Sequence, residues 1–562
     1  VFMEGMTGRL FREFSIVISG AVIISSFVAL TFTPMLSTKL LKKREQQNWL
    51  YRKTEPFFVF LNRIYKTGLD FFLSHKYIVI PIIGLTLILV VVLIGIIPSE
   101  MAPLEDRSQV IIRATAPEGA TFEYIRDYND KIAHIADSVV DEREAIIAMV
   151  RSSWSNVRVL LPDIRERKRS QMEIAAELSN AVRSETEARS FVQQQSTFGG
   201  RGGMPVQYVL QAPNIDKLEE YIPVFMDKVN ASPQFQMADV NLKFTKPETR
   251  VIIDRDKAAL LGVSTRDIGQ TLQYALSGQR MGYFYMNGKQ YQILGEINRQ
   301  QRNTPLDLRT IYVKNAKGEM IQLDNLVRLL EDVAPPQLYR YDRFTSATVS
   351  AGLAPGYTIG DGLERMDEIA EEALDETFRT ALTGESKEFR ESSSSLFFAF
   401  GLALVLIVLI LAAQFESFKD PFVIMFTVPL AVAGAFIFMY AFDVTMNIYS
   451  QIGIIMLIGL VAKNGILIVE FANQRQDDGL SKLEAVRTAA AQRFRPILMT
   501  SLSTILGLIP LAMASAEGAN GRIAMGISVI GGMLISTIFT LFVIPVMYVY
   551  ISTERKNKKI AE

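Results

Sequence analysis

The stretch QIGIIMLIGLVAKNGILIVEF, residues 451–471, is apolar and long enough to cross a lipid bilayer as one helix. Lys463 stands near its middle, where an ammonium group costs about 2.5–3.5 kcal/mol on membrane-insertion scales. One interpretation is a lysine whose long side chain reaches the membrane surface. Phe471 lies eight residues further on, roughly 12 Å along a helix, which is a long reach. We favour the other interpretation, a charge that couples proton or ion movement and needs an anionic partner.

The composition of the 562-residue chain is segmented, because long apolar runs at both ends flank a polar middle. Hydrophobic residues make up 49% of the chain and the formal net charge is zero, so no basic excess indicates nucleic acid as a partner. The absence of cysteine excludes disulfides, and the two histidines, His75 and His134, argue against a histidine-based catalytic or metal site. The residues that follow Val1 lack the basic segment of a signal peptide, so we expect none. We also expect that the chain begins within a longer protein.

Seven apolar segments are long enough to span a membrane, and the positive-inside rule orients them. The loop 37–76 is strongly basic and is expected in the cytoplasm; within it, residues 57–72 have the apolar spacing of an amphipathic helix along the membrane surface. Alternation then places 98–395 on the opposite side and the tail 552–562 in the cytoplasm. The predicted spans are 14–36, 77–97, 396–413, 421–442, 448–471, 496–513 and 524–551.

The polar middle predicts a mixed α and β domain with an internal repeat. The order of its first half is typical of a ferredoxin-like βαβ unit: strand 108–114, helix 118–139, strands 145–150 and 157–161, helix 170–184. A second copy is expected from strand 206–210, helix 216–229, strands near 238–244 and 249–253, strand 346–351 and helix 359–374. Asn287-Gly288 and Lys317-Gly318 predict hairpins, so residues 256–336 are expected to form an inserted β-rich lobe.

The fold class that follows is a membrane α-helical bundle of seven spans with a large α+β extracytoplasmic domain of ferredoxin-like repeats and an inserted β-rich lobe. The expected divisions are 1–36 (one span), 37–76 (basic loop with amphipathic helix), 77–97 (span), 98–255 (first part of the domain), 256–336 (lobe), 337–395 (remainder of the domain), 396–551 (five-span bundle) and 552–562 (tail).

One loop, STFGGRGGMP at 196–205, is rich in glycine and therefore permissive of unusual backbone conformations. It has no lysine followed by serine or threonine, so it is not a phosphate-binding loop. The loop is either an ordinary surface linker or a mobile segment that lines a ligand path. The candidate residues in it are Phe198, Gly199, Gly200, Gly202 and Gly203.

The partner of Lys463 is not evident in the chain. None of the seven predicted spans has an aspartate or glutamate in its interior, and the nearest polar candidates are Arg493, Arg495 and Thr500 around the start of the sixth span. A buried cation with further cations nearby is not a complete electrostatic arrangement. We infer that the acid lies in sequence outside this chain.

Three strings resemble the resistance-nodulation-division (RND) transporters, and among them the AcrB-like hydrophobe/amphiphile exporters. They are GLVAKNGILIVEFA (459–472), RFRPILMTSLSTILGLIPLA (493–512) and MGISVIGGM (525–533). Two further strings fit the same pattern, FREFSIVISGAVIISSFVALTFTPML (11–36) and LAAQFESFKDPFVIM (411–425). The resemblance covers essentially the whole chain, including the large domain between the second and third spans.

The resemblance implies a bacterial inner-membrane proton/drug antiporter with twelve spans in two similar halves, of which this chain is the C-terminal half. It implies a homotrimer in contact with membrane lipid, with the large domain in the periplasm and with a periplasmic adaptor and an outer-membrane channel as partners. Small amphiphilic compounds are the implied substrates, and the proton gradient replaces any cofactor. By this resemblance, Lys463 would pair with two aspartates of the absent half, and Arg493 and Thr500 would be further positions of the proton relay. The loop 196–205 would be a switch loop with Phe198 at an aromatic position.

Two alternatives remain open at this point. The first is a metal-ion exporter of the same superfamily, which predicts that Met204, Met226, Met281 and Met286 converge on one cleft. The second is a membrane receptor or secretion accessory that transports nothing and has no need of Lys463. No Walker A signature is present, which argues against ATP as the energy source.

Overall fold

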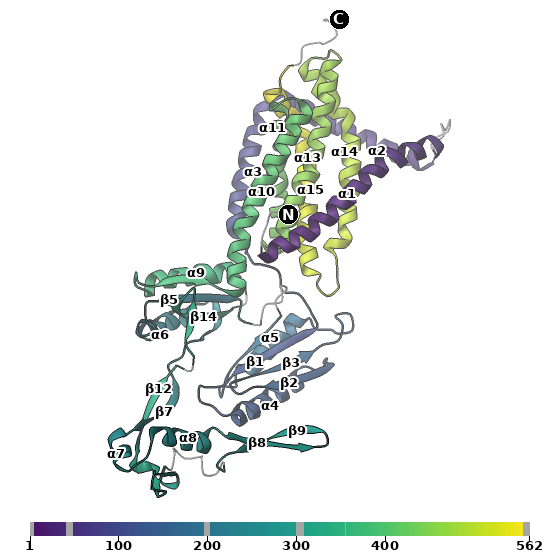
Figure 1. The fold of residues 1–562 in the computed structure, drawn as a ribbon. Helices are drawn as coiled ribbons and strands as arrows, with labels where there is room; N and C mark the ends of the chain where they lie inside the picture. Colours follow the sequence, from purple (N-terminus) through teal and green to yellow (C-terminus); the bar gives the residue numbers. More distant parts are fainter. Residues whose placement is uncertain are drawn as a thin grey trace. The chain divides into compact units, whose positions relative to one another are not determined.

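The computed structural model describes residues 5–40, 49–195, 203–298, 308–335, 337–354 and 356–554. The chain divides into two compact units, one formed by Leu242–Leu338 and the other by the rest of the chain (Figure 1). Each unit is described by itself below.

Within the described ranges, seven helices are long and apolar enough to cross a membrane, which confirms the predicted helical segments. Most of them run alongside one another in Figure 1. The predicted span 421–442 is two helices in sequence, and it begins at Lys419. The helices are α1 (Gly5–Leu40), α3 (Val79–Ile96), α10 (Gly384–Phe415), α11 (Lys419–Met425), α12 (Thr427–Ala441), α13 (Ile448–Asp477), α14 (Lys482–Ala512) and α15 (Asn520–Ile551).

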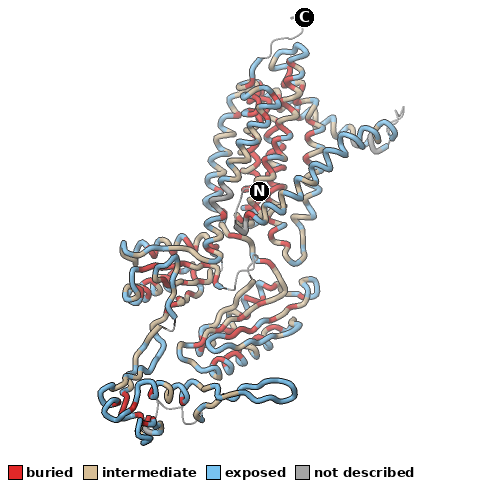
Figure 2. The backbone as a smooth tube through the Cα atoms, in the orientation of Figure 1, coloured by how far each residue is buried: buried red, intermediate tan, exposed pale blue. Residues whose placement is uncertain are grey.

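Two helix starts in this bundle follow from side-chain caps. The side chain of Asn447 accepts hydrogen bonds from the backbone of Tyr449 and Ser450, in a capping box that begins α13. Ser481 caps α14 by accepting from the backbone of Glu484. The buried residues gather in the interior of the bundle, as Figure 2 shows, whereas the apolar stretch of α1 is exposed in this chain.

The glycine-rich start of the last span lets three helices approach closely. A Cβ atom on Gly532 would lie 2.0 Å from Leu457 Cδ2 in α13 and 2.9 Å from the carbonyl oxygen of Ala431 in α12. A Cβ on Gly531 would lie 2.4 Å from Phe438 Cβ in α12. The glycines therefore set the distance between α15 and its neighbours, as small residues do in membrane bundles.

An amphipathic helix, α2 (Trp49–Ser74), lies in the predicted basic loop and packs on the bundle. Its buried residues, Tyr65, Leu69 and Leu73, join the apolar cluster of α13, α14 and α15. Phe57, Phe60 and Phe71 on the same helix are more than half exposed, so its apolar surface is wider than the part the bundle covers.

The first sheet of the larger unit has the spatial order β2-β3-β1-β4, and all its pairs are antiparallel. Alternate residues of β1, Val110, Ile112 and Ala114, face the core, which α4 and α5 cover. Its elements are β1 (Gln109–Thr115), α4 (Phe122–Val139), β2 (Ala145–Val150), β3 (Trp154–Leu160), α5 (Gln171–Val182) and β4 (Arg189–Gln193).

The second sheet has the order β13-β14-β5-β15, with β6 paired to β14. The predicted strand near 238–244 lies earlier, as β6. Its elements are β5 (Val206–Ala212), α6 (Ile215–Ala231), β6 (Phe235–Val240), β13 (Tyr339–Tyr341), β14 (Phe344–Leu353), α9 (Ile359–Ala373) and β15 (Arg379–Leu382).

The predicted strand 249–253 was wrongly assigned to this second sheet. It belongs to β7 (Lys246–Ile253), which pairs along its whole length with β12 (Val327–Ala334) in the smaller unit. The lobe expected at 256–336 is therefore larger, and the compact unit runs from Leu242 to Leu338. The reason is that β7 finds its partner strand far along the chain, which its own sequence does not encode.

The smaller unit also contains two hairpins and two short helices. Asn287 and Gly288 both have positive φ, 52° and 72°, as a two-residue turn between β8 and β9 requires. The remaining elements are α7 (Arg255–Leu260), α8 (Thr265–Leu276), β8 (Gln279–Met286), β9 (Lys289–Gly295), β10 (Tyr312–Lys314) and β11 (Met320–Gln322).

Candidate functional site

Lys463 lies midway along α13 and is exposed in this chain, whereas the next residue, Asn464, is 2% exposed. Adjacent helix positions point about 100° apart, so the lysine and the asparagine face different sides of α13. Among the described residues, Lys463 has no ion pair with a carboxylate within 4.0 Å. The face of α13 that carries the charge is thus open to a partner.

A buried polar triad joins three helices beside this lysine. Asn464 Nδ2 of α13 donates to Ser501 Oγ of α14 at 3.3 Å, and Thr537 Oγ1 of α15 donates to the same oxygen at 3.0 Å. Ser501 is 2% exposed and Thr537 8% exposed. Sequence reasoning missed the triad, because serine and threonine are common in membrane helices and only the packing shows which of them meet.

Arg493 and Thr500, the other predicted relay residues, lie within α14 rather than at its start. The guanidinium of Arg493 stacks over the ring of Phe471, 4.4 Å from its centroid, and Arg475 approaches the same ring at 4.8 Å. Thr500 Oγ1 donates to the carbonyl of Ile497 at 3.1 Å. In the described part of the chain neither residue is within hydrogen-bond contact of Lys463, so their relay role stays a prediction.

The glycine-rich loop falls mostly outside the described residues, which leaves Phe198, Gly199, Gly200 and Gly202 without a structural account. Gly203 is described and exposed, and its carbonyl accepts a hydrogen bond of 3.0 Å from Gln193 Nε2. The role of the loop in a substrate path stays a prediction.

One buried carboxylate escaped the sequence reasoning. Asp420 in the first turn of α11 is 3% exposed and accepts hydrogen bonds from Asn473 and Ser552. The predicted span begins at Pro421, one residue later, so Asp420 lies just outside the predicted segment. The helix that begins at Lys419 therefore carries this acid in its first turn, at its end rather than in its interior.

The membrane helices contact the linker that enters the first sheet. Ser99 bridges to Met446 between α12 and α13, and Thr445 Oγ1 donates to the carboxylate of Glu100. Further along the linker, Ser108 Oγ donates to Glu517 in the turn between α14 and α15. Both turns at this end of the bundle are thus attached to the same linker.

The methionines named for a metal site divide between the two units. Met204 is buried two residues before β5 and Met226 lies in α6, whereas Met281 and Met286 are exposed on β8 of the smaller unit. The described residues contain no group of three or more histidine and acidic side chains that could hold a metal ion.

Seven apolar helices among the described residues, with a polar domain inserted after the second of them, indicate a protein that spans a membrane several times. Residues 1–552 match the model of the AcrB/AcrD/AcrF family. The chain belongs to that family.

A curated relative supports this assignment. An uncharacterized transporter of Haemophilus influenzae is 33% identical over 567 residues, an alignment that covers 99% of this chain. The same alignment covers 55% of the relative, so the chain spans about half the length of the protein it matches.

Proposed function

We propose that the intact protein is a proton-driven exporter of small amphiphilic compounds in the bacterial inner membrane, and that this chain is its C-terminal half. The observation that carries the proposal is Lys463, an exposed cation midway along a membrane-spanning helix. Such a charge is costly in a bilayer unless an acid faces it, and intramembrane charges mark ion and proton pathways. The half-length match to the relative leaves room for a segment that supplies the acid.

The proposed mechanism is a shift between two packings of the bundle. When the acids that face Lys463 are protonated, their attraction to the ammonium weakens, and the face of α13 that carries it becomes free to move. The Asn464–Ser501–Thr537 triad ties α13 to α14 and α15, so movement of α13 reaches both helices. The turns at Thr445 and Glu517 then displace the linker that enters the first sheet.

The finer assignments are part of the same proposal. The strand order of both sheets supports ferredoxin-like porter subdomains, and the smaller unit would be a docking lobe. Assembly as a homotrimer, with a periplasmic adaptor and an outer-membrane channel, would place that lobe toward the channel. The resemblance of the quoted motifs supports the hydrophobe/amphiphile subfamily, and with it the proposed class of substrate.

The test is Lys463→Ala in the intact transporter, reconstituted in proteoliposomes with an imposed proton gradient and a fluorescent amphiphile. We expect export to fall to the level of empty vesicles while yield and thermal stability stay unchanged. Lys39→Ala is the matched control, because Lys39 is an exposed lysine in the last turn of α1, and it should leave export intact. Normal export by Lys463→Ala, or export that survives a proton uncoupler, would refute the proposal.

A second measurement examines the half-protein assignment. Residues 1–562 alone, reconstituted in the same vesicles, should show no proton-coupled flux, because the acids are absent. Flux from this chain alone would show that the coupling group lies within it.

A further inference from the structure

A buried hydrogen-bond network joins α11, α13 and α15 where the latter two helices end, and we call it the Asp420 clamp. Asp420 Oδ2 accepts from Asn473 Nδ2 of α13 at 3.1 Å, and Asp420 Oδ1 accepts from Ser552 Oγ, just after α15, at 2.7 Å. Tyr548 of α15 donates its hydroxyl to Asn473 Oδ1, and Gln476 of α13 donates to the Tyr548 oxygen. The clamp comprises these five residues, each no more than 6% exposed.

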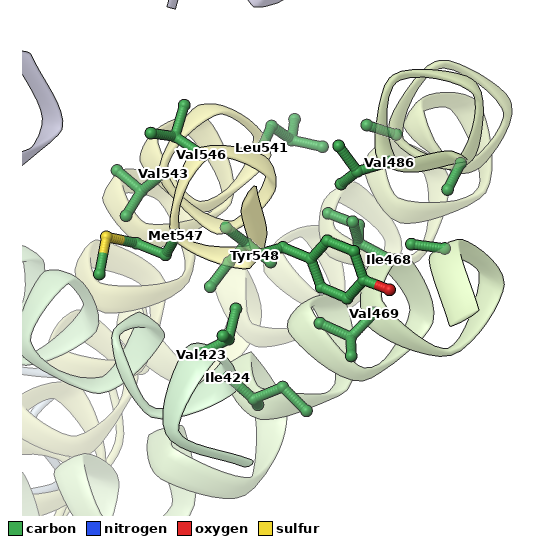
Figure 3. Close-up of a cluster of buried hydrophobic side chains, with 14 of the residues drawn as sticks. Val423, Ile424, Ile468, Val469, Val486, Leu541, Val543, Val546, Met547 and Tyr548 are labelled. Carbon is green, nitrogen blue, oxygen red and sulfur yellow. The ribbon is translucent and has the colours of Figure 1, made fainter. Parts of the chain in front are cut away.

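The surroundings of the clamp are apolar. Tyr548 lies in the cluster shown in Figure 3, among Val423, Ile424, Ile468 and Val469. A carboxylate buried in such surroundings is costly unless donors satisfy it, and here two side-chain donors do so. One donor belongs to α13 and the other follows α15, while the carboxylate belongs to α11. Both hydrogen bonds therefore form together only when these three helices are in the arrangement seen here.

Lys482 of a fourth helix, α14, also binds the end of α15. Lys482, the first residue of α14, donates from Nζ to the carbonyls of Ser552 and of Val549, the latter at 2.7 Å. Ammonium groups stabilise the last carbonyls of a helix, which carry the negative end of its dipole. The end of α15 is therefore held twice, through the Ser552 hydroxyl by Asp420 and through the Ser552 carbonyl by Lys482.

The clamp sits on the helix that carries the proposed coupling lysine. Asn473 is ten residues beyond Lys463 in α13, about 15 Å along the helix. The Asn464–Ser501–Thr537 triad holds α13 at the level of Lys463 by one hydrogen bond between neutral groups, from Asn464 to Ser501. The clamp has a carboxylate as its acceptor and is the stronger attachment. Of the two attachments, the triad is thus the one that can open without exposing a charge.

We propose that Asp420 is a positioning residue for transport: it binds the ends of α11, α13 and α15 into one rigid unit, so that α13 pivots from this end when the segment around Lys463 moves. The pivoting of α13 rests on the proposed function, in which the segment around Lys463 moves. The existence of the rigid unit does not depend on the proposed function. The clamp then stays closed throughout the transport cycle and the triad above it rearranges.

Cross-linking in the intact transporter tests the rigid unit directly. Asp420 and Ser552 touch through their side chains, and the chain has no cysteine, so Asp420→Cys with Ser552→Cys introduces the only thiols in these 562 residues. Before cross-linking, we expect this double variant to transport at least roughly tenfold more slowly than the parent, since misplaced elements far from the chemistry have effects of that size. A short bifunctional methanethiosulfonate reagent that joins the two thiols should restore transport to within about twofold of the parent, because it replaces the lost attachment.

Each single cysteine variant, treated with the same reagent, controls for modification alone and should show no recovery. Asp478→Asn is the matched control for the loss of a carboxylate at this end of α13, because Asp478 is exposed and paired with Arg475. It should leave transport unchanged. If the joined thiols fail to restore transport in protein that remains folded, the ends of α11 and α15 move relative to each other and the proposal is wrong.

Hydrogen exchange provides a readout that does not require transport. In the parent, the backbone amides of the last turn of α15, including Ser552, which donates to the Tyr548 carbonyl, should exchange slowly. Asp420→Asn should speed exchange there and at the end of α13 while the amides around Thr537 keep their protection. If export fails in the parent but this pattern holds, the proposed function is wrong and the clamp stands. Unchanged exchange in Asp420→Asn would overturn the clamp.

Discussion

The rings of Tyr65 and Phe494 stack in parallel, with centroids 4.4 Å apart and 8° between their planes. Tyr65 belongs to α2 and Phe494 to α14, so the stack attaches the amphipathic helix to the bundle. The hydroxyl of Tyr65 continues past the stack and donates to the Leu541 carbonyl of α15 at 2.9 Å. One side chain of α2 thus contacts two membrane helices, α14 and α15.

Two substitutions of Tyr65 distinguish the contribution of the ring stack from that of the hydrogen bond. Tyr65→Ala should lower the free energy of unfolding by about 3–5 kcal/mol, because it removes a buried aromatic ring. Tyr65→Phe keeps the stack and loses the hydrogen bond, so we expect a loss of about 0.5–1.5 kcal/mol. Thermal unfolding in detergent measures both. Phe60→Ala on the same helix is the control, since Phe60 is 57% exposed and should have little effect. Equal losses for Tyr65→Ala and Phe60→Ala would show that α2 is not attached through this ring.

Glu100 should make stability depend on pH. Burial raises the pKa of its carboxyl above the ordinary value of 4.5, the hydrogen bond from Thr445 lowers it, and the negative charge of Glu385 raises it further. A raised pKa means that the folded state holds the proton to higher pH than the unfolded state does. The contribution to stability is therefore complete below about pH 4.5 and is lost as the pH rises through the pKa of the folded state.

Glu100→Gln removes this titration. We expect the variant to match the parent near pH 4 and to be more stable at neutral pH, by about 1.4 kcal/mol for each unit by which the pKa is raised. Unfolding curves across this pH range measure the difference. Glu144→Gln, at an exposed carboxylate directly before β2, should follow the parent at every pH. A Glu100→Gln curve parallel to the parent would contradict the prediction.

Gly532 should not tolerate a side chain. A Cβ there meets Leu457, whose side chain can turn aside, but also the Ala431 carbonyl at 2.9 Å, which belongs to the backbone of α12. Gly532→Ala should therefore force α12 and α15 apart and destabilise the bundle by about 1–3 kcal/mol. Gly84→Ala is the comparison, because a Cβ on Gly84 in α3 meets nothing within 4 Å. If both variants unfold at the temperature of the parent, close approach of α12 and α15 is not required.

Hydropathy was enough to find all seven apolar helices, since the length of an apolar run is a local property of the sequence. Strand periodicity likewise located β2 and the turn at Asn287-Gly288. The pairing of β7 with β12 was missed, because a partner distant in sequence leaves no mark on the strand itself. The lobe boundary was misplaced for the same reason.

The candidate site was only partly predictable. The position of Lys463 in a membrane helix came directly from its apolar neighbours. Neither the triad nor the Asp420 clamp could be found in this way, because each depends on polar residues from separate helices meeting in space. Asp420 next to Pro421 looks like an ordinary acidic helix start, and only the packing shows that it is buried and bonded to Asn473 and Ser552.

The helix α10 is continuous from Gly384 to Phe415, and its first turn is fixed to the second sheet where the backbone amide of Gln207 donates to Ser386 Oγ at 2.8 Å. Its later turns form a membrane span that begins at Phe398. An α-helix turns about 100° per residue, so the face that α10 presents to β5 fixes the face that it presents to the membrane helices. The rotation of one end of α10 about the helix axis is therefore fixed relative to the other end. One residue inserted into α10 would rotate the end that contacts β5 by about 100° relative to the end in the membrane bundle. The number of residues in this helix is therefore constrained, as well as their apolar character.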